Sequence, residues 1–295
     1  LIMIEFLSTK NNLIRTKDEI FITKSKSSKN KNSLLYDAVG GTTLFERCRI
    51  PGTLSFFDFE IVKTKVLANM STRHKVILDL GCGDGRFTYE FLKNPNTRVI
   101  CVDSSYESLL RLKKNIDMSA NRDRVLLINE DILKLPKFDK KVDAVWAFES
   151  LYYLDNDYGK GVNNISKLIK SNGVLYNAER NYSGGVFHSL INGRLDHFFE
   201  AANDNKIYDY FEDSELRTPS FKDKEIINIL QNCDLKLKKT HRLPIVNAYL
   251  SFLLSQKIYN YEEIKINSKK LLDTLVNMDL SEDSSRVTIY ESKKA

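Results

Sequence analysis

Residues 76–87 have the sequence Val76-Ile77-Leu78-Asp79-Leu80-Gly81-Cys82-Gly83-Asp84-Gly85-Arg86-Phe87. Four of the first five residues are apolar, which is typical of a short, buried parallel strand. Glycines follow at alternate positions, where they permit backbone angles that other residues avoid and let a ligand approach the main chain closely. A helix is predicted directly after them, over residues 86–93. The glycines therefore lie between a strand end and a helix start, where nucleotide-like ligands bind in open α/β sheets.

An acidic residue, Asp79, stands two places before the first glycine, so the loop has the pattern D-x-G-x-G-x-G. A dinucleotide fingerprint, G-x-G-x-x-G, would have its third glycine where this chain has Arg86. The pattern resembles the first motif of class I S-adenosylmethionine-dependent methyltransferases. In that family the loop contacts the methionine part of the cofactor. The resemblance implies the following cofactor contacts: Asp79, Gly81, Cys82, Gly83 and Gly85.

A second predicted strand, residues 97–102, is followed by Asp103, 18 residues after Gly85. The resemblance implies that the Asp103 carboxylate accepts hydrogen bonds from both ribose hydroxyls of the cofactor, with Ser104 beside it. The alternative role is a helix cap, since residues 104–107 have the form of a capping box.

A third predicted strand, residues 125–129, is followed by Glu130, Asp131 and Ile132. The resemblance implies that Asp131 accepts a hydrogen bond from the adenine amino group and that the backbone N–H of Ile132 donates to the ring. The alternative is that Asp131 is a turn residue before Pro136.

Residues 138–148 look like the family's fourth strand, and the sequence after it resembles an E-x-L-x-H/Y motif. The resemblance implies that this strand end, Phe148 included, meets the amino group of the cofactor and faces the transferred methyl group. Glu149 and Tyr152 are therefore candidate acceptor-site residues. The chain lacks Asn/Asp-Pro-Pro-Tyr/Phe and Pro-Cys motifs here, which disfavours methylation of adenine N6 and cytosine C5.

The expected fold is therefore an α/β, Rossmann-like, doubly wound sheet of seven strands with the last strand antiparallel. We expect a helix over residues 161–170, ended by Gly173 as its C′ residue, and strands over residues 174–178, 234–242 and 286–290. Residues 181–219 and 243–280 are expected to be insertions that form a lid over the site.

Two expected domains divide the chain at residue 33. Residues 1–33 form an N-terminal appendage, with short β-like pieces at residues 2–7, 13–14 and 20–22 and then a flexible, basic linker. The methyltransferase domain covers residues 34–295 and begins with a helical lead-in, residues 34–70. Its helix runs from Leu54 to Met70 with Thr53 as a candidate N-cap, while Tyr36 either covers the cofactor or packs in the core.

The net charge of +6 is concentrated near the N-terminus, because residues 10–31 alone carry +5 and leave about +1 for the rest. The body of the protein therefore lacks the charge pattern of a nucleic-acid-binding surface, and we expect no nucleic-acid partner. Residues 24–32 are either a solvated linker or a grip on an acidic partner. The apolar start lacks the basic flank of a signal peptide, and no apolar run approaches the ~20 residues of a membrane span, so we expect a cytoplasmic protein without membrane association.

The four cysteines are far apart in the sequence and are predicted to be buried, reduced thiols. With four scattered histidines, the chain has no metal-ligand spacing, and we expect no metal site. His188 and His197 lie in the first lid insertion, where each is either a general base or an ordinary polar residue.

The resemblance implies methyl transfer from S-adenosylmethionine to an acceptor, with S-adenosylhomocysteine as the product. A small-molecule acceptor is the main expectation. The aromatic residues of the lid either suit an apolar or aromatic acceptor or only pack the lid onto the body of the protein. The positional candidates for catalysis are Glu149, Tyr152 and His188. The alternatives are methylation of a protein, peptide or RNA, a non-catalytic cofactor-binding regulator and a hydride-transfer enzyme. The apolar run 248–254 lines the pocket or forms a homodimer face.

Overall fold

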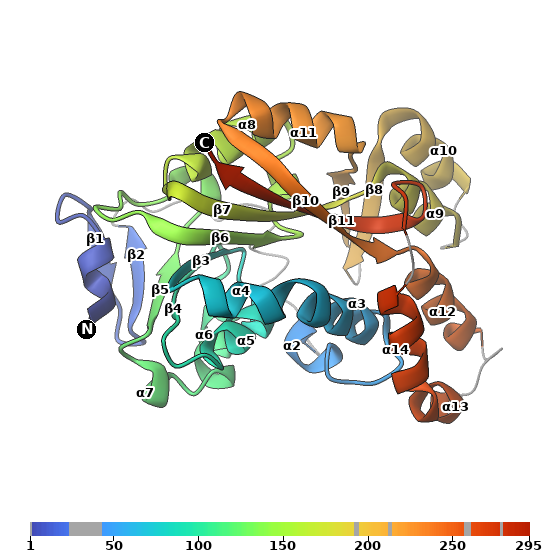
Figure 1. Cartoon of the computed structure of the whole chain (residues 1–295), viewed down its shortest axis with the longest axis horizontal. Helices are drawn as coiled ribbons and strands as arrows, with labels where there is room; N and C mark the ends of the chain where they lie inside the picture. The colour runs from blue at the N-terminus through green and yellow to red at the C-terminus, as the bar shows by residue number, and fades with distance from the viewer. Residues whose placement is uncertain (1, 24–42, 192–194, 212–213, 257–260, 278–279) are drawn as a thin grey trace.

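The computed structural model describes residues 2–23, 43–191, 195–211, 214–256, 261–277 and 280–295 (Figure 1). A single nine-stranded sheet in the described residues has the order β1-β2-β5-β4-β3-β6-β7-β11-β10, and its middle is parallel. The strands of this sheet are β1 (Leu13–Arg15), β2 (Ile20–Thr23), β3 (Val76–Leu80), β4 (Arg98–Asp103), β5 (Val125–Asn129), β6 (Val142–Phe148), β7 (Ile169–Arg180), β10 (Leu235–Pro244) and β11 (Ser285–Lys294).

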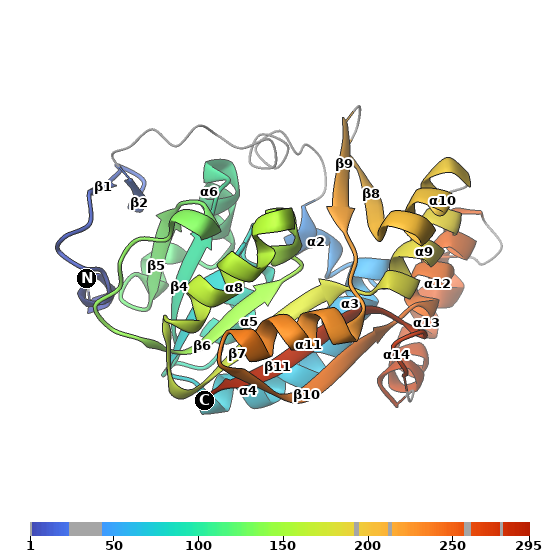
Figure 2. The same cartoon turned by 90° about the horizontal axis from the view of Figure 1, so that it is seen from above.

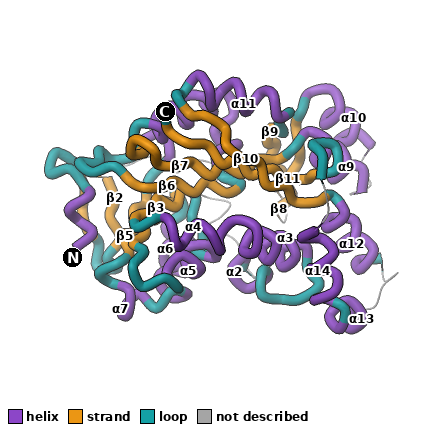
Figure 3. The backbone as a smooth tube through the Cα atoms, viewed as in Figure 1, coloured by secondary structure: helices purple, strands orange, loops and turns teal. Residues whose placement is uncertain are grey.

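The seven strands from β5 to β10 form the expected Rossmann-like sheet, and β11 runs antiparallel to both neighbours as predicted. β3 is buried at all five positions, because helices cover the sheet on both faces. Figure 3 shows the strands as a central layer between two layers of helices.

Two more strands come from the N-terminal segment. The β-like pieces expected at residues 13–14 and 20–22 are present as β1 and β2. They form a hairpin, and β2 pairs in parallel with β5, so the hairpin extends the main sheet. The prediction of a β-like piece at residues 2–7 is wrong, because residues Ile2–Phe6 form a 3-10 helix, η1. Met3 and Phe6 are buried while Ile4 is exposed, a three-residue spacing that suits this helix rather than a strand.

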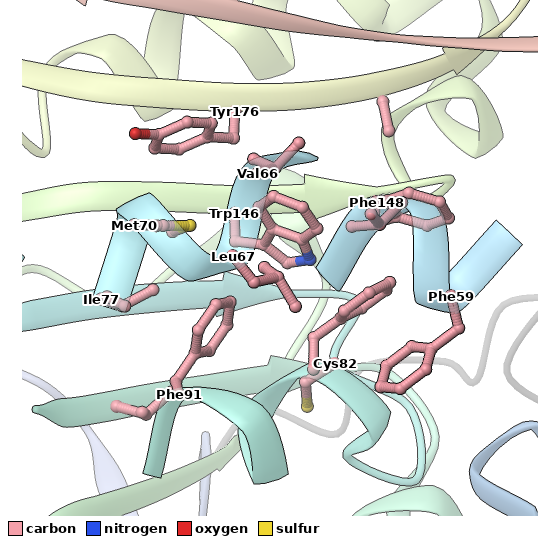
Figure 4. Close-up of a cluster of buried hydrophobic side chains, with 14 of the residues drawn as sticks. Phe59, Val66, Leu67, Met70, Ile77, Cys82, Phe91, Trp146, Phe148 and Tyr176 are labelled. Carbon is pink, nitrogen blue, oxygen red and sulfur yellow. The ribbon is translucent and has the colours of Figure 1, made fainter. Parts of the chain in front are cut away.

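One face of the sheet is covered by α3 (Leu54–Val62), η2 (Lys63–Leu67), α4 (Ala68–Arg73), α5 (Arg86–Leu92) and α6 (Tyr106–Asn115). Trp146 is the centre of the core on this face, between Tyr176 and Phe91 (Figure 4). Its ring centroid lies 5.9 Å from the centroid of each of these two rings. The other face is covered by η1, α8 (Tyr158–Ser166) and α11 (Asp223–Asn232).

The lead-in helix begins where the sequence predicts. Thr53 is the N-cap of α3, and its side chain accepts a hydrogen bond from the Phe56 N–H at 3.1 Å. The helical path continues through η2 and α4 to Arg73. A shorter helix, α2 (Leu44–Arg47), precedes it.

Two helix ends differ from the sequence pattern. The capping-box form of residues 104–107 places the cap of α6 one residue early, because the N-cap is Ser105, whose hydroxyl accepts from the Ser108 N–H at 3.1 Å. The helix expected over residues 161–170 ends at Ser166, and Gly173 lies inside β7 instead of ending a helix. A Cβ added at Gly173 would lie 2.8 Å from the Asp143 carbonyl oxygen, so this glycine permits close packing beside the irregular β6–β7 pairing.

The two predicted insertions consist mainly of helices and one hairpin, which lie beyond the end of β6. The first contains α9 (Tyr182–Ile191), α10 (Leu195–Asp204) and the hairpin of β8 (Lys206–Phe211) and β9 (Ser214–Pro219). The second contains α12 (Val246–Ser255), α13 (Tyr261–Ile266) and α14 (Ser268–Asn277). Figures 1 and 2 show these elements gathered at the end of the molecule toward which the arrow of β6 points.

The remaining short helices are α7 (Met118–Asn121), η3 (Ile132–Lys134) and η4 (Leu151–Asp157). None of the helices among the described residues has the length and apolar character needed to cross a membrane. All four cysteines are free and buried, as the sequence predicts.

Candidate functional site

The glycine loop connects β3 to α5, and its three glycines have positive φ angles of 66° at Gly81, 53° at Gly83 and 88° at Gly85. A Cβ added at Gly81 would lie 2.5 Å from the Ser150 Cβ, and one at Gly85 would lie 2.8 Å from the Leu112 Cγ. A Cβ at Gly83 would meet no atom within 4 Å. Gly81 and Gly85 therefore permit packing inside the protein, whereas Gly83 leaves space in which a ligand fits against the backbone.

This difference predicts different effects for two alanine substitutions. Gly81→Ala is expected to destabilise the fold by roughly 1–3 kcal/mol, because the new methyl group overlaps Ser150. Gly83→Ala is expected to cost only about 1 kcal/mol of backbone strain but to weaken cofactor binding at least tenfold, because the methyl group occupies the ligand space. Thermal melts and calorimetric titration with S-adenosylhomocysteine measure the two effects. Unchanged affinity in folded Gly83→Ala would contradict the role of Gly83.

Asp103, at the end of β4, joins the loop to the next helix. Its Oδ2 accepts a hydrogen bond from the Gly83 N–H and its Oδ1 accepts one from the Ser105 N–H, both at 2.8 Å. Ser104, which the resemblance names as a cofactor contact, lies between Asp103 and Ser105, the two residues that this second hydrogen bond joins. Carboxylate oxygens accept more than one hydrogen bond, so this geometry is compatible with further donors such as ribose hydroxyls.

Asp131 follows the end of β5 and caps η3, where its Oδ1 accepts from the Leu133 N–H at 2.8 Å. Its own N–H donates to the buried Glu130 carboxylate at 3.0 Å. Asn129 donates to the Asp103 carbonyl oxygen at 2.9 Å and so ties the ends of β4 and β5 together. Asp131 and the adjacent Ile132 therefore stand beside the Asp103 region, the position proposed for the adenine contacts.

Asp79 is buried inside β3, and the Thr88 hydroxyl donates to its Oδ2 at 2.6 Å. Burial raises the pKa of Asp79 to about 7, although the hydrogen bond from Thr88 opposes this shift. The side chain therefore fixes the first helical turn after the glycine loop to the strand before it. Cys82 is also buried, so both residues hold the glycine loop against the interior of the protein.

The raised pKa of Asp79 predicts a pH dependence of stability. Between about pH 4 and pH 7 the folded protein keeps the proton of Asp79 while the unfolded chain releases it, so this group's contribution to stability falls as pH rises. Asp79→Asn keeps an acceptor for Thr88 and removes the ionisation. Denaturant unfolding of the ligand-free protein at pH 5 and pH 7.5 should show a larger loss for the wild type than for the variant. Equal losses would contradict the buried, protonated state.

The turn after β6 brings the ends of β3, β6 and β7 together. The Ser150 hydroxyl donates to the Leu80 carbonyl oxygen at 3.0 Å, and the Glu149 N–H donates to the Ala178 carbonyl oxygen at 3.0 Å. Glu149 itself has a φ of 50°, a strained angle for a residue with a side chain. The ring of Phe148 lies in the core beside Phe87, with centroids 4.8 Å apart.

Glu149 belongs to a charge quartet that consists of the buried Asp58 and the half-buried Glu149, Arg180 and Arg286. The Oε1 of Glu149 lies 3.4 Å from the Arg180 Nε and 3.6 Å from an Arg286 terminal nitrogen. Burial raises the pKa of Glu149, but Arg286 and Arg180 outweigh this effect and hold the pKa below its ordinary value. The carboxylate is thus held ionised between two guanidinium groups, which favours a positioning role over proton transfer.

The quartet continues into the lead-in helix and both insertions. Arg286 on β11 forms an ion pair with Asp58 on α3, and Asn247 of α12 donates to Asp58 at 2.8 Å. Arg180 donates to the Thr218 hydroxyl of β9 at 3.2 Å. Sequence reasoning missed Asp58, Arg180 and Arg286, because no motif marks them and their partners are distant in the chain.

Tyr152 is buried under Arg180, whose guanidinium carbon lies 4.6 Å from the Tyr152 ring centroid. The Tyr152 hydroxyl donates to the Tyr153 hydroxyl at 3.3 Å. His188 lies on α9, half-buried in the first insertion, and His197 is buried on α10. Tyr36 lies outside the described residues. Glu149 and Tyr152 thus share Arg180 as a neighbour, whereas His188 belongs to the lid insertion.

Comparison with known proteins supports this arrangement. Residues 77–173 match a family described as a methyltransferase domain. A putative S-adenosylmethionine-dependent methyltransferase from Listeria monocytogenes is similar at 12% identity and a TM-score of 0.57, over 81% of this chain and 99% of that one. The N-methyltransferase NodS from Bradyrhizobium japonicum WM9, solved with S-adenosylhomocysteine, is similar at 13% identity and a TM-score of 0.50, over 91% and 99%.

The pyocyanin biosynthetic protein PhzM is similar at 14% identity and a TM-score of 0.51, over 82% of this chain. This chain spans 55% of the length of PhzM. At these identities the structural likeness shows the fold.

The sheet order and the glycine loop at the end of β3 define a Rossmann-like, cofactor-binding protein. With the family match, residues 77–173 are a class I, S-adenosylmethionine-dependent methyltransferase domain. The chain therefore contains a methyltransferase domain, whose cofactor is S-adenosylmethionine.

Proposed function

We propose that this enzyme transfers the methyl group of S-adenosylmethionine to a small-molecule acceptor. The observation that carries the proposal is the set of elements around the end of β6. The lead-in helix α3 contacts α12 and α14, α9 contacts α12 and β8, and β9 contacts η4. Elements of both insertions and of the lead-in thus pack against one another near the strand end where the methyl group is transferred in this class. Such packing beside the site favours an acceptor of limited size over a folded polymer.

The residues present fit the cofactor. Gly83 leaves space beside the backbone, Asp103 presents a carboxylate at the end of β4, and Asp131 follows the end of β5. In the proposed site Asp103 binds the ribose hydroxyls, Asp131 binds the adenine amino group and the loop backbone holds the methionine part. S-adenosylmethionine supplies an activated methyl group when bound, while the protein orients the acceptor for in-line attack and excludes water.

Glu149, Tyr152 and Arg180 are the proposed acceptor-side residues at the end of β6 and β7. The half-buried Tyr153 ring, whose centroid lies 4.4 Å from that of the buried Tyr152 ring, offers an aromatic wall near the Arg180 guanidinium. This wall supports an aromatic or apolar acceptor. Two of the similar structures, PhzM and NodS, are described as a biosynthetic protein and an N-methyltransferase, which also supports a small acceptor.

The proposal is tested by measuring S-adenosylhomocysteine release from S-adenosylmethionine in the presence of small aromatic and apolar acceptors, peptides and RNA. The full chain should turn over only with small molecules, and the same rate should persist when the four lysines of the basic segment, Lys24, Lys26, Lys29 and Lys31, are replaced by serine. Turnover confined to a peptide or RNA, with a salt-sensitive affinity that is lost on this replacement, would contradict the proposal.

A further inference from the structure

Arg86 is a half-buried cation at the start of α5, directly after the glycine loop. Its guanidinium carbon lies 4.6 Å from the Phe87 ring centroid and 4.9 Å from the Phe148 ring centroid. The guanidinium therefore extends from the glycine loop toward the end of β6. Stacking on two rings compensates only part of the cost of removing an arginine from water.

No acid in the described part of the chain forms an ion pair with Arg86, and no described acceptor takes a hydrogen bond from it. The two acids whose pKa values Arg86 lowers do not fill this role. Glu149 is already paired with Arg180 and Arg286, and Asp79 keeps its proton up to about pH 7 and accepts from Thr88. The charge of Arg86 is therefore available to an anionic group of a ligand.

Charge effects on neighbouring groups agree with this location. Arg86 is among the cations that lower the pKa of Glu149 and of Asp79, and it also lowers the pKa of Cys48, which burial raises overall. Cys48 directly follows α2 in the lead-in. Arg86 is thus close to the strand ends on one side and to the lead-in on the other.

We propose that Arg86 binds the amino-acid carboxylate of S-adenosylmethionine. This inference rests on the proposed binding of that cofactor at the glycine loop. The carboxylate is the only anionic group of the cofactor, since the sulfonium and ammonium groups are cations and the adenosine part is neutral. A guanidinium fork matches a carboxylate in a bidentate pair, and its position next to the loop places it on the methionine side rather than on the ribose side. A carboxylate of the methyl acceptor is the alternative ligand for the Arg86 guanidinium.

The test compares S-adenosylmethionine with decarboxylated S-adenosylmethionine, which lacks only this carboxylate. Binding to the wild type, Arg86→Gln and Arg86→Lys is measured by calorimetry on the full chain. We expect Arg86→Gln to weaken binding of S-adenosylmethionine at least tenfold but to change binding of the decarboxylated compound less than twofold. Arg86→Lys should recover part of the loss, because it keeps the charge without the fork. Arg98→Gln, at the opposite end of β4, is the matched control and should bind like the wild type.

An equal loss for both compounds, or no loss for either, would overturn the assignment of Arg86 to the cofactor carboxylate. Normal cofactor binding in Arg86→Gln together with a raised KM for a carboxylated acceptor would assign the arginine to the acceptor and would likewise overturn it. A wild type that binds neither compound would instead refute the proposed cofactor site itself. Binding of the decarboxylated compound by Arg86→Gln serves as the folding control.

Discussion

Arg286→Ala is expected to lower the free energy of unfolding by about 3–5 kcal/mol. Arg286 is the central cation of the charge quartet, because it faces both Asp58 and Glu149. The side chains of Arg286 and Asp58 are 14% and 7% exposed, so the carboxylates left behind would be largely shielded from water. Chemical denaturation with a two-state fit, supported by thermal melts, measures the effect.

Arg73→Ala is the matched control for this substitution. The Arg73 side chain is 60% exposed and lies 4.0 Å from Glu291, so its removal should cost less than about 1 kcal/mol. Adding Asp58→Asn to Arg286→Ala should recover part of the stability, because it removes one of the uncompensated charges. A cost for Arg286→Ala no greater than that for Arg73→Ala would show that the quartet does not stabilise the fold.

Asp103→Ala is expected to weaken binding of S-adenosylmethionine by about 10- to 100-fold, which corresponds to the loss of hydrogen bonds to a charged acceptor. The substitution also leaves the N–H groups of Gly83 and Ser105 without their carboxylate partner, so the glycine loop loses an anchor. Both consequences act on the cofactor site, and calorimetry measures their sum.

Asp123→Ala is the matched control for Asp103→Ala. Asp123 is an exposed acid that precedes β5, at the opposite end of the sheet from the proposed site. Its removal changes the net charge equally and should leave affinity unchanged. If Asp103→Ala folds normally and binds the cofactor as tightly as the wild type, the ribose role of Asp103 is wrong.

The sequence predicts the parallel centre of the sheet well, because mostly apolar runs as short as β3 and β6 suit a buried strand better than a helix, and glycines directly follow β3. The glycine loop is predictable for the same local reason, since strand, loop and helix are adjacent in the chain. The boundary near Gly173 was missed, because a glycine after a polar dipeptide is typical of a helix end, whereas here it fits against the Asp143 carbonyl oxygen of the neighbouring strand.

The charge quartet was not predictable, because its contacts depend on the three-dimensional arrangement of distant segments. Asp58 and Arg286 are separated by 228 positions in the sequence. Glu149 was singled out from its position after β6, but the two arginines that hold it ionised come from β7 and β11. The motif therefore located the strand end correctly, and only the structure distinguished a positioning carboxylate from a candidate base.

The most direct test of the cofactor site is a calorimetric titration of the full wild-type chain with S-adenosylhomocysteine, with Asp103→Ala titrated alongside. The site described here predicts saturable binding at micromolar affinity or tighter, with a loss of an order of magnitude or more in the variant. Absence of binding by the folded wild type to both S-adenosylhomocysteine and S-adenosylmethionine would contradict the assignment of the glycine loop as the cofactor site.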